Sequence, residues 1–170
     1  MKMDRIIERL RMNAKSIRGL VAGTNREQAR WKPSPKRWSL LEVINHLHDE
    51  ECEDFRRRID LILHSDGSPW PPIDPPAWIE GRRYNDRDVE ESLKRFLDER
   101  QRSIAWLEDL ESPAWDRKYQ HPELGEISGG DLVASWLAHD LLHIRQLTRL
   151  HFDYISSLTG SYSTDYAGPW

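Results

Sequence analysis

The segment from Gly130 to Leu150, GDLVASWLAHDLLHIRQLTRL, constrains the fold more than any other part of the chain. Its apolar residues recur every three or four positions, and neither proline nor glycine interrupts it after Gly130. This periodicity predicts a long α-helix. The stripe that faces inward combines His139, His143 and Gln146 with Leu132, Trp136 and Leu150, and it borders a second apolar band of Val133, Leu137, Leu141 and Ile144.

The two histidines of this helix lie one turn apart, roughly 6 Å along the helix axis, and both are expected to face inward. Two imidazoles on one apolar face are costly to bury without partners, and from this spacing they can bind one metal ion together. The spacing therefore indicates either a metal site or a structural, hydrogen-bonded pair. A metal site requires a third ligand from elsewhere in the chain.

Three further segments show helical periodicity. The first covers residues 3–21 and is ended by Gly23 and Asn25, which tolerate positive φ. The second begins at Ser39, which forms a capping-box pattern with Glu42, and runs to about His64. The third spans about residues 86–110. The helix that begins near Gly130 is the fourth, and we expect it to continue to about Thr159. Together these segments predict an all-α four-helix bundle in a single domain that spans residues 1–170.

A proline-rich segment, residues 66–85, connects the second and third helices. It holds five of the ten prolines, so we expect a stiff crossover that packs Trp70 and Trp78 over the bundle. Its length allows the second and third helices to run parallel to each other. Residues 113–129 carry turn signals and predict a short hairpin or an ordered loop before the last helix.

Composition excludes several classes of protein. The formal net charge is -4 with 32% charged residues of both signs, which argues against a nucleic-acid partner. The one cysteine, Cys52, excludes an internal disulfide, and its helical context favours a packed residue over a nucleophile. No apolar run approaches the roughly 20 residues of a membrane span, and the basic start lacks a signal-peptide core. We therefore expect a soluble, cytoplasmic protein with no membrane partner.

The second predicted helix carries two histidines close together. Its buried stripe consists of Leu40, Ile44, Leu47, Phe55, Ile59 and Ile62. His48 lies near this stripe, whereas His46 lies at its far edge, beside Val43 and Glu50. Periodicity alone therefore favours His48 as the inward histidine.

Four motifs give the chain a family resemblance from about Trp31 to Leu150. They are RWSLLEVINHLHDEE, WPPIDPPAW, YQHPELGEIS and AHDLLHIRQL. In this combination the chain resembles the DinB/YfiT-like superfamily, and its layout is close to that of the thiol-dependent S-transferases, which include bacillithiol transferases. The resemblance implies a four-helix bundle that binds a divalent metal ion through three histidines.

The resemblance also implies which histidines are the ligands. In the family, one ligand follows a tryptophan of the second helix by eight residues, which corresponds to His46 after Trp38. The other two form an HxxxH pair on the fourth helix, here His139 and His143, with Gln146 at a position that is often polar. The implied metal ligands are thus His46, His139 and His143, in place of His48. A metal bound in a cleft at the edge of the bundle would reconcile this assignment with the periodicity.

Three neutral imidazoles leave at least one coordination position open, as in catalytic zinc sites. Zinc or nickel is the expected metal, although iron and cobalt also suit such ligands. The resemblance implies a metal-dependent transferase that activates a low-molecular-weight thiol for attack on an electrophilic substrate, or a related metal hydrolase. The alternative is a non-enzymatic, stress-related bundle that could form a homodimer and whose metal site is structural or vestigial.

Other polar residues have two interpretations each. Glu50 could accept a hydrogen bond from His46 or serve as an occasional metal ligand, but a solvated carboxylate is favoured for it. Asp140 is expected to be a surface charge. His121 could lie at the mouth of the cleft, although a turn residue is favoured.

An anionic thiol cofactor could meet the basic end of the crossover. Arg82, Arg83 and Tyr84 lie there, although arginine pairs in loops usually face water. His64 and His151 are expected to be surface residues near helix ends.

Overall fold

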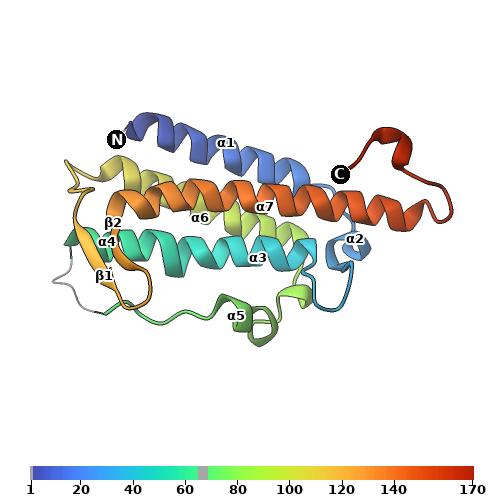
Figure 1. Cartoon of the computed structure of the whole chain (residues 1–170), viewed down its shortest axis with the longest axis horizontal. Coiled ribbons are helices and arrows are strands. Elements are labelled where there is room, and N and C mark those ends of the chain that lie inside the picture. Colours follow the sequence, from blue (N-terminus) through green and yellow to red (C-terminus); the bar gives the residue numbers. More distant parts are fainter. Residues whose placement is uncertain (1, 65–68) are drawn as a thin grey trace.

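Four long helices form the body of the protein (Figure 1). The computed structural model describes residues 2–64 and 69–170. Helix α1 spans Met3–Val21, α6 spans Val89–Asp109 and α7 spans Gly129–Leu158. The fourth rod is composite, because α3 (Leu40–Glu50) continues through the π-helical segment η1 (Glu51–Phe55) into α4 (Arg56–His64). The predicted four-helix bundle is confirmed.

The helices run in two parallel pairs. Figure 1 shows α1 and α7 running in one direction, whereas the α3–α4 rod and α6 run in the other. Residues 69–88, the described part of the connection from α4 to α6, contain α5 (Pro75–Gly81) and the 3-10 turn η2 (Tyr84–Asp86). Residues 66–68 of the expected crossover lie outside the described residues. In the rest, Trp70 stacks on Tyr119 at 4.2 Å and Trp78 packs under Arg82.

Helix starts agree with the capping signals of the sequence. The Ser39 hydroxyl accepts from the Glu42 amide, and the Glu42 carboxylate accepts from the Ser39 amide. Ser128 and Asp131 form the same reciprocal cap at the start of α7. These caps satisfy backbone donors that an α-helix cannot bond internally, so they fix where α3 and α7 begin.

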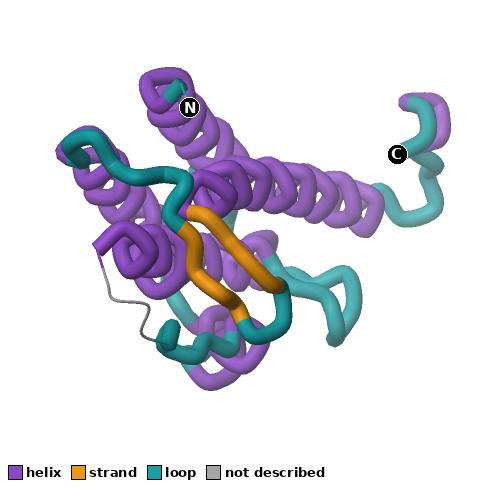
Figure 2. Tube along the Cα trace, turned by 60° about the vertical axis from the view of Figure 1, so that its left-hand side comes forward, coloured by secondary structure: helices purple, strands orange, loops and turns teal. Residues whose placement is uncertain are grey.

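Short elements complete the fold. Helix α2 spans Arg26–Arg30, a turn that was not predicted, and η3 spans Asp165–Ala167 in the C-terminal tail. Strands β1 (Lys118–His121) and β2 (Gly125–Ser128) pair antiparallel, which realises the hairpin alternative for residues 113–129. Figure 2 shows this hairpin at one end of the bundle. None of the described helices is long and apolar enough to cross a membrane.

The π-helical segment keeps the composite rod in register with the core. Eight residues separate Leu47 from Phe55, and an unbroken α-helix would rotate the second away from the first by about 80°. The π segment takes more residues per turn and removes much of this rotation. Leu47 and Phe55 are consequently both buried, and Phe55 stacks on Trp136 of α7 at 5.6 Å.

A layer of buried charges crosses the bundle between its two apolar clusters. One cluster contains Ile17, Leu47, Phe96 and Leu147, and the other contains Leu10, Ile59, Ile104 and Trp136. Arg100 of α6 lies in this layer and donates to Glu51 at 2.6 Å and to Asp140 at 2.7 Å. The three side chains are at most 2% exposed.

The expectation that Asp140 is a surface charge is wrong. Its carboxylate is fully buried and also accepts from the Asn13 amide of α1 at 3.0 Å. Helix α7 packs against α1 on one side and the α3–α4 rod on the other. Two faces of α7 are therefore covered, whereas the periodicity argument assumed one.

Replacing Arg100 by methionine should lower the free energy of unfolding by about 3–5 kcal/mol, because two carboxylates lose their partner in the interior. Urea denaturation followed by circular dichroism measures the change. The matched control is Arg11→Met, which breaks the exposed ion pair with Glu108 and should cost no more than about 1 kcal/mol. Equal destabilisation by the two substitutions would show that the buried network does not stabilise the fold.

Candidate metal centre

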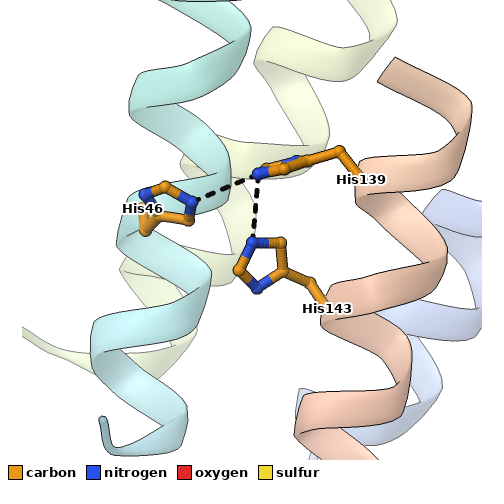
Figure 3. Close-up of side chains that lie close together, drawn as sticks. All are labelled: His46, His139 and His143. Carbon is orange, nitrogen blue, oxygen red and sulfur yellow. Dashed lines mark hydrogen bonds between the residues drawn. The ribbon is translucent and has the colours of Figure 1, made fainter. Parts of the chain in front are cut away.

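Three histidines from two helices converge in the middle of the bundle (Figure 3). His46 projects from α3, and His139 and His143 project from successive turns of α7. The Nε2 atom of His139 lies 3.3 Å from Nε2 of His46 and 3.1 Å from Nε2 of His143. The same ring nitrogen of all three residues therefore points to one place.

These separations fit a single metal ion. Nitrogen ligands lie about 2.0–2.1 Å from zinc, so two of them in tetrahedral geometry are about 3.3 Å apart. The candidate ligand atoms of the three histidines all lie within 4.8 Å of one another. Three neutral nitrogen donors suit zinc, nickel, cobalt or iron(II). The donor set and its spacing thus fit a divalent ion with at least one open position.

The histidines are held in their neutral form. Burial, helped by the charge that His143 can carry, lowers the pKa of His46 to about 3. Burial and the two neighbouring imidazoles lower the pKa of His139 to about 2. Burial also lowers the pKa of His143, although its contact with Gln146 opposes this shift. No proton has to be displaced from these rings at neutral pH before a metal binds.

Hydrogen bonds to Nδ1 direct the Nε2 lone pairs inward. The Gln146 side-chain oxygen lies 2.8 Å from Nδ1 of His143, so this nitrogen donates and leaves Nε2 as the free acceptor. Such contacts fix the tautomer and orientation of histidine ligands at metal sites. Gln146, singled out in the sequence as a polar neighbour of the pair, positions His143.

Glu50 faces His46 and does not face solvent, so the favoured interpretation of it as a solvated carboxylate is wrong. Its side chain is buried, and Oε1 lies 3.6 Å from Nδ1 of His46. Neither atom has a hydrogen-bond partner among the described residues. Burial and the adjacent Asp54 carboxyl raise the pKa of Glu50. A shift of a few tenths of an ångström would close an N–H···O bond that orients His46.

Aromatic rings form the walls of the site. Trp38 meets the ring of His46 edge-on at 4.9 Å and stacks over His143 at 6.3 Å. Phe55 lies 5.1 Å from the ring of His139. These contacts limit the positions that the imidazoles can adopt.

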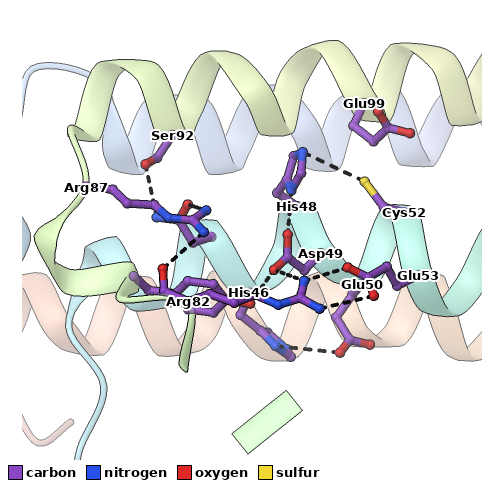
Figure 4. A network of polar contacts seen from close by, with 12 residues as sticks. His46, His48, Asp49, Glu50, Cys52, Glu53, Arg82, Arg87, Ser92 and Glu99 are labelled. Atoms are coloured by element: carbon purple, nitrogen blue, oxygen red, sulfur yellow. Dashed lines mark hydrogen bonds and ion pairs between the residues drawn. The ribbon is translucent and has the colours of Figure 1, made fainter. Parts of the chain in front are cut away.

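His48 projects from the opposite face of α3. It contacts Asp49 and Cys52 and faces α6, whereas His46 faces α7 (Figure 4). Periodicity favoured His48 because an apolar stripe identifies only one buried face of a helix. Helix α3 is covered by α7 on one side and α6 on the other, so both histidines are largely enclosed.

The basic residues of the crossover already form ion pairs with carboxylates of the protein. Arg82 donates to Asp49 at 2.6 Å and to Glu53 at 2.5 Å, and the hydroxyl of Tyr84 donates to the same Asp49 carboxylate. Arg83 pairs with Asp86. His121 caps its own turn by accepting from the amides of Glu123 and Leu124. None of these four side chains lies among the three clustered histidines.

His64 is exposed and paired with Asp60, as expected of a surface residue. His151 differs from the expectation. It is partly buried, with Nε2 2.5 Å from the carbonyl oxygen of Leu20 and Nδ1 2.9 Å from the Gln28 amide. It therefore ties α7 to the end of α1.

A cleft of about 590 Å³ borders His143 and was not identified from the sequence. Its wall includes Gln146, Trp170 and three arginines, namely Arg37, Arg145 and Arg149. Arg149 bonds Asp153 at 2.6 Å, and Arg37 lies 3.6 Å from the same residue. Arg145 and Arg149 lie on α7 close to His143, whereas Arg37 and Trp170 come from distant parts of the chain, so only the fold shows that these residues share a cleft beside the histidines.

Comparisons with known proteins agree on one family. Residues 9–147 match the family model described as the DinB superfamily. A protein of Oceanobacillus iheyensis, named as a candidate metal-dependent hydrolase, is 28% identical over 134 residues, which cover 79% of this chain and 77% of the relative. The solved structure of YfiT from Bacillus subtilis superposes with a TM-score of 0.77 at 23% identity, covering 88% of this chain and 85% of that one. Its description is a probable metal-dependent hydrolase with an unusual four-helix bundle topology.

Substituting Glu50 by alanine should weaken metal affinity by about 10–100-fold, because His46 loses the carboxyl group that is positioned to accept from its Nδ1. Competition with a chromophoric chelator for nickel measures the affinity. Glu53→Ala is the matched control, since Glu53 is three residues away and pairs with Arg82 without facing His46. Similar metal affinities for the two variants would show that Glu50 does not support metal binding.

Proposed function

The chain belongs to the DinB superfamily, and on this premise we propose that it is a metal-dependent enzyme that transfers a low-molecular-weight thiol to an electrophilic substrate. His46, His139 and His143 are the proposed ligands of a divalent ion, with zinc or nickel the expected metal. The observation that carries the proposal is the convergence of three Nε2 atoms, with His143 at the border of an open cleft.

Each part of the site has a role in this reaction. A divalent ion bound there supplies Lewis acidity, which lowers the pKa of a thiol or water that it coordinates. His46, His139 and His143 would hold the ion through Nε2, and as neutral imidazoles they need not lose a proton when it binds. The thiolate attacks an electrophilic carbon, a C–S bond forms, and the leaving group departs with its electron pair while the thiol proton passes to solvent. Trp38 and Phe55 limit the positions of the ligand rings.

The arginine-lined cleft supports a thiol that carries negative charge. Arg37, Arg145 and Arg149 line it together with the ligand His143. Guanidinium groups recognise carboxylates and phosphates through paired hydrogen bonds. A thiol with carboxylate groups could therefore bind these arginines while its sulfur reaches the histidine cluster. We propose this cleft as the cofactor site in place of the end of the crossover, because the cleft borders His143 and its Arg145 forms no ion pair with the described residues. Arg37 and Arg149 share Asp153, whereas Arg82 is bound to both Asp49 and Glu53.

Hydrolysis is the second candidate, and the names of the two relatives favour it. Water in the open position would replace the thiol as nucleophile. Glu50 faces Nδ1 of His46, on the far side of the ring from the three converging nitrogens. It therefore orients a ligand and is badly placed to act as a general base for water. This geometry is our reason for preferring the thiol.

His143→Ala should abolish metal-dependent thiol conjugation while the bundle stays folded. The substitution removes one of three ligands, and alanine keeps the propensity of α7 for helix. Conjugation rates with added zinc or nickel are compared with thermal melting by circular dichroism. His64→Ala, an exposed histidine outside the site, is the control and should keep full activity.

Three results would contradict the transferase. An unfolded His143→Ala variant would favour a structural metal. A folded variant with unchanged activity would show that the reaction does not depend on the metal. Metal-dependent ester or amide hydrolysis by the wild type, without thiol conjugation, would favour the hydrolase.

Arg145→Gln should raise the KM for a thiol that bears carboxylates and leave the KM for an uncharged thiol unchanged. The reason is that the lost guanidinium interacts with the anionic group and lies outside the metal ligands. Arg9→Gln, an exposed arginine of α1, is the matched control. Equal effects on both thiols would exclude the cleft as the anion site.

A further inference from the structure

We propose a second metal site, formed by His48, Cys52 and Glu99 on the opposite face of α3 from the three-histidine centre, that takes a thiophilic divalent cation such as Zn²⁺. It is independent of the proposed transferase reaction. His48 belongs to α3, Cys52 to the π segment η1 and Glu99 to α6. Figure 4 shows the three side chains on the α6 side of the rod, with His46 and Glu50 on the other side.

The ligand atoms have the spacing of a metal site. Nε2 of His48 lies 3.8 Å from Sγ of Cys52, and the candidate ligand atoms of all three residues lie within 4.8 Å of one another. Zinc binds nitrogen at about 2.0–2.1 Å and thiolate sulfur at about 2.3 Å, which puts the two donors about 3.6 Å apart in tetrahedral geometry. The imidazole, thiolate and carboxylate together suit zinc, with a fourth position left for water.

Asp49 orients His48 in the way that a carboxylate orients a histidine ligand of a metal. Nδ1 of His48 lies 2.7 Å from Oδ1 of Asp49, so Nδ1 donates the proton and Nε2 presents a lone pair toward Cys52. Asp49 is fixed in turn by Arg82 and by the hydroxyl of Tyr84. Burial opposes ionisation of Asp49, but the bonds from His48, Tyr84 and Arg82 outweigh it and lower its pKa to about 2. A carboxylate that orients a histidine in this way is typical of zinc sites.

Cys52 lies within the π segment, one turn after His48. His48 and Cys52 are separated by four residues, and the rod departs from α-geometry immediately before the cysteine, at Glu51. Single π turns within helices occur frequently at functional sites. In this chain the wider turn keeps Phe55 in the core, and Cys52 faces α6.

Charges around the thiol favour a cation over a reactive cysteine. Burial, followed by the carboxylates of Glu99 and Asp49, raises the pKa of Cys52 to about 12, so the free thiol is protonated and a poor nucleophile. Glu99 and Asp49 attract a metal ion, which ionises a coordinated thiol, whereas the nearby Arg56 opposes them.

Glu99 can serve as a ligand while it keeps its existing partners. Its carboxylate accepts from Arg56 and, at 2.8 Å, from Arg102. Two carboxylate oxygens offer about four lone-pair positions, so two arginine contacts leave room for a metal bond.

Cobalt absorption tests the site, because Cys52 is the one cysteine of the chain and is thus the one source of a thiolate-to-cobalt charge-transfer band. The double variant His139→Ala/His143→Ala removes the first centre and should still bind one equivalent of Co²⁺ with this near-ultraviolet band. The wild type should bind two equivalents. Adding Cys52→Ser to the double variant should abolish the band and the remaining binding.

Glu99→Gln in the same double variant should weaken cobalt binding about ten-fold or more, whereas Glu90→Gln, an exposed residue of α6, should not change it. Zinc should also slow the alkylation of Cys52. A folded double variant that binds cobalt without the band, or that binds none while zinc leaves alkylation unchanged, would overturn the proposal. Because the first centre is absent from these variants, either result leaves the transferase proposal unaffected.

Discussion

The bidentate contact between Arg100 and Asp140 determines how the rest of the bundle is arranged. A guanidinium and two carboxylates in the interior cost several kcal/mol each to desolvate, and they are tolerated only when they are paired. Arg100 donates to Asp140, Glu51 and the carbonyl oxygen of Leu10. Oε2 of Glu51 is the one carboxylate oxygen of this layer without a hydrogen-bond partner among the described residues. The indole of Trp136 also donates to Glu51 at 2.7 Å. Three rods are thereby fixed in rotation as well as in position.

This fixed rotation also affects the candidate metal centre. Asp140 is adjacent to His139 in sequence, and Glu51 is adjacent to Glu50, which faces His46. A rotation of α7 that moved Asp140 away from Arg100 would also move His139 away from His46. The charged layer therefore aligns two helices whose candidate ligands would have to meet within a few tenths of an ångström of the right spacing. Apolar packing alone specifies such alignment less strictly, because apolar contacts have no direction.

Local signals in the sequence were sufficient for the fold and for much of its detail. The four apolar stripes predicted the helices, and the Ser39–Glu42 and Ser128–Asp131 pairs predicted two of their starts. Asp140 and Glu50 were assigned to the surface because a stripe argument gives each helix a single buried face. In this bundle α7 and α3 are covered on two sides, so carboxylates outside the stripe are buried and paired. The π segment has no sequence signal that distinguishes it from an α-helix, and the arginine cleft depends on tertiary contacts.

The position of α3 between α7 and α6 also explains why His46 and His48 face different partners. Residues two apart on an α-helix point about 200° away from each other. On a helix with one buried face, one of the two would lie in solvent. Here His46 meets the histidines of α7, and His48 meets Cys52 and lies near Glu99 of α6. A single rod can thus present nitrogen donors to two neighbours, and a register shift of one residue in α3 would disrupt both sets of contacts at once. The Ser39–Glu42 cap at its start and the Glu51–Arg100 contact at its end hold that register from both sides.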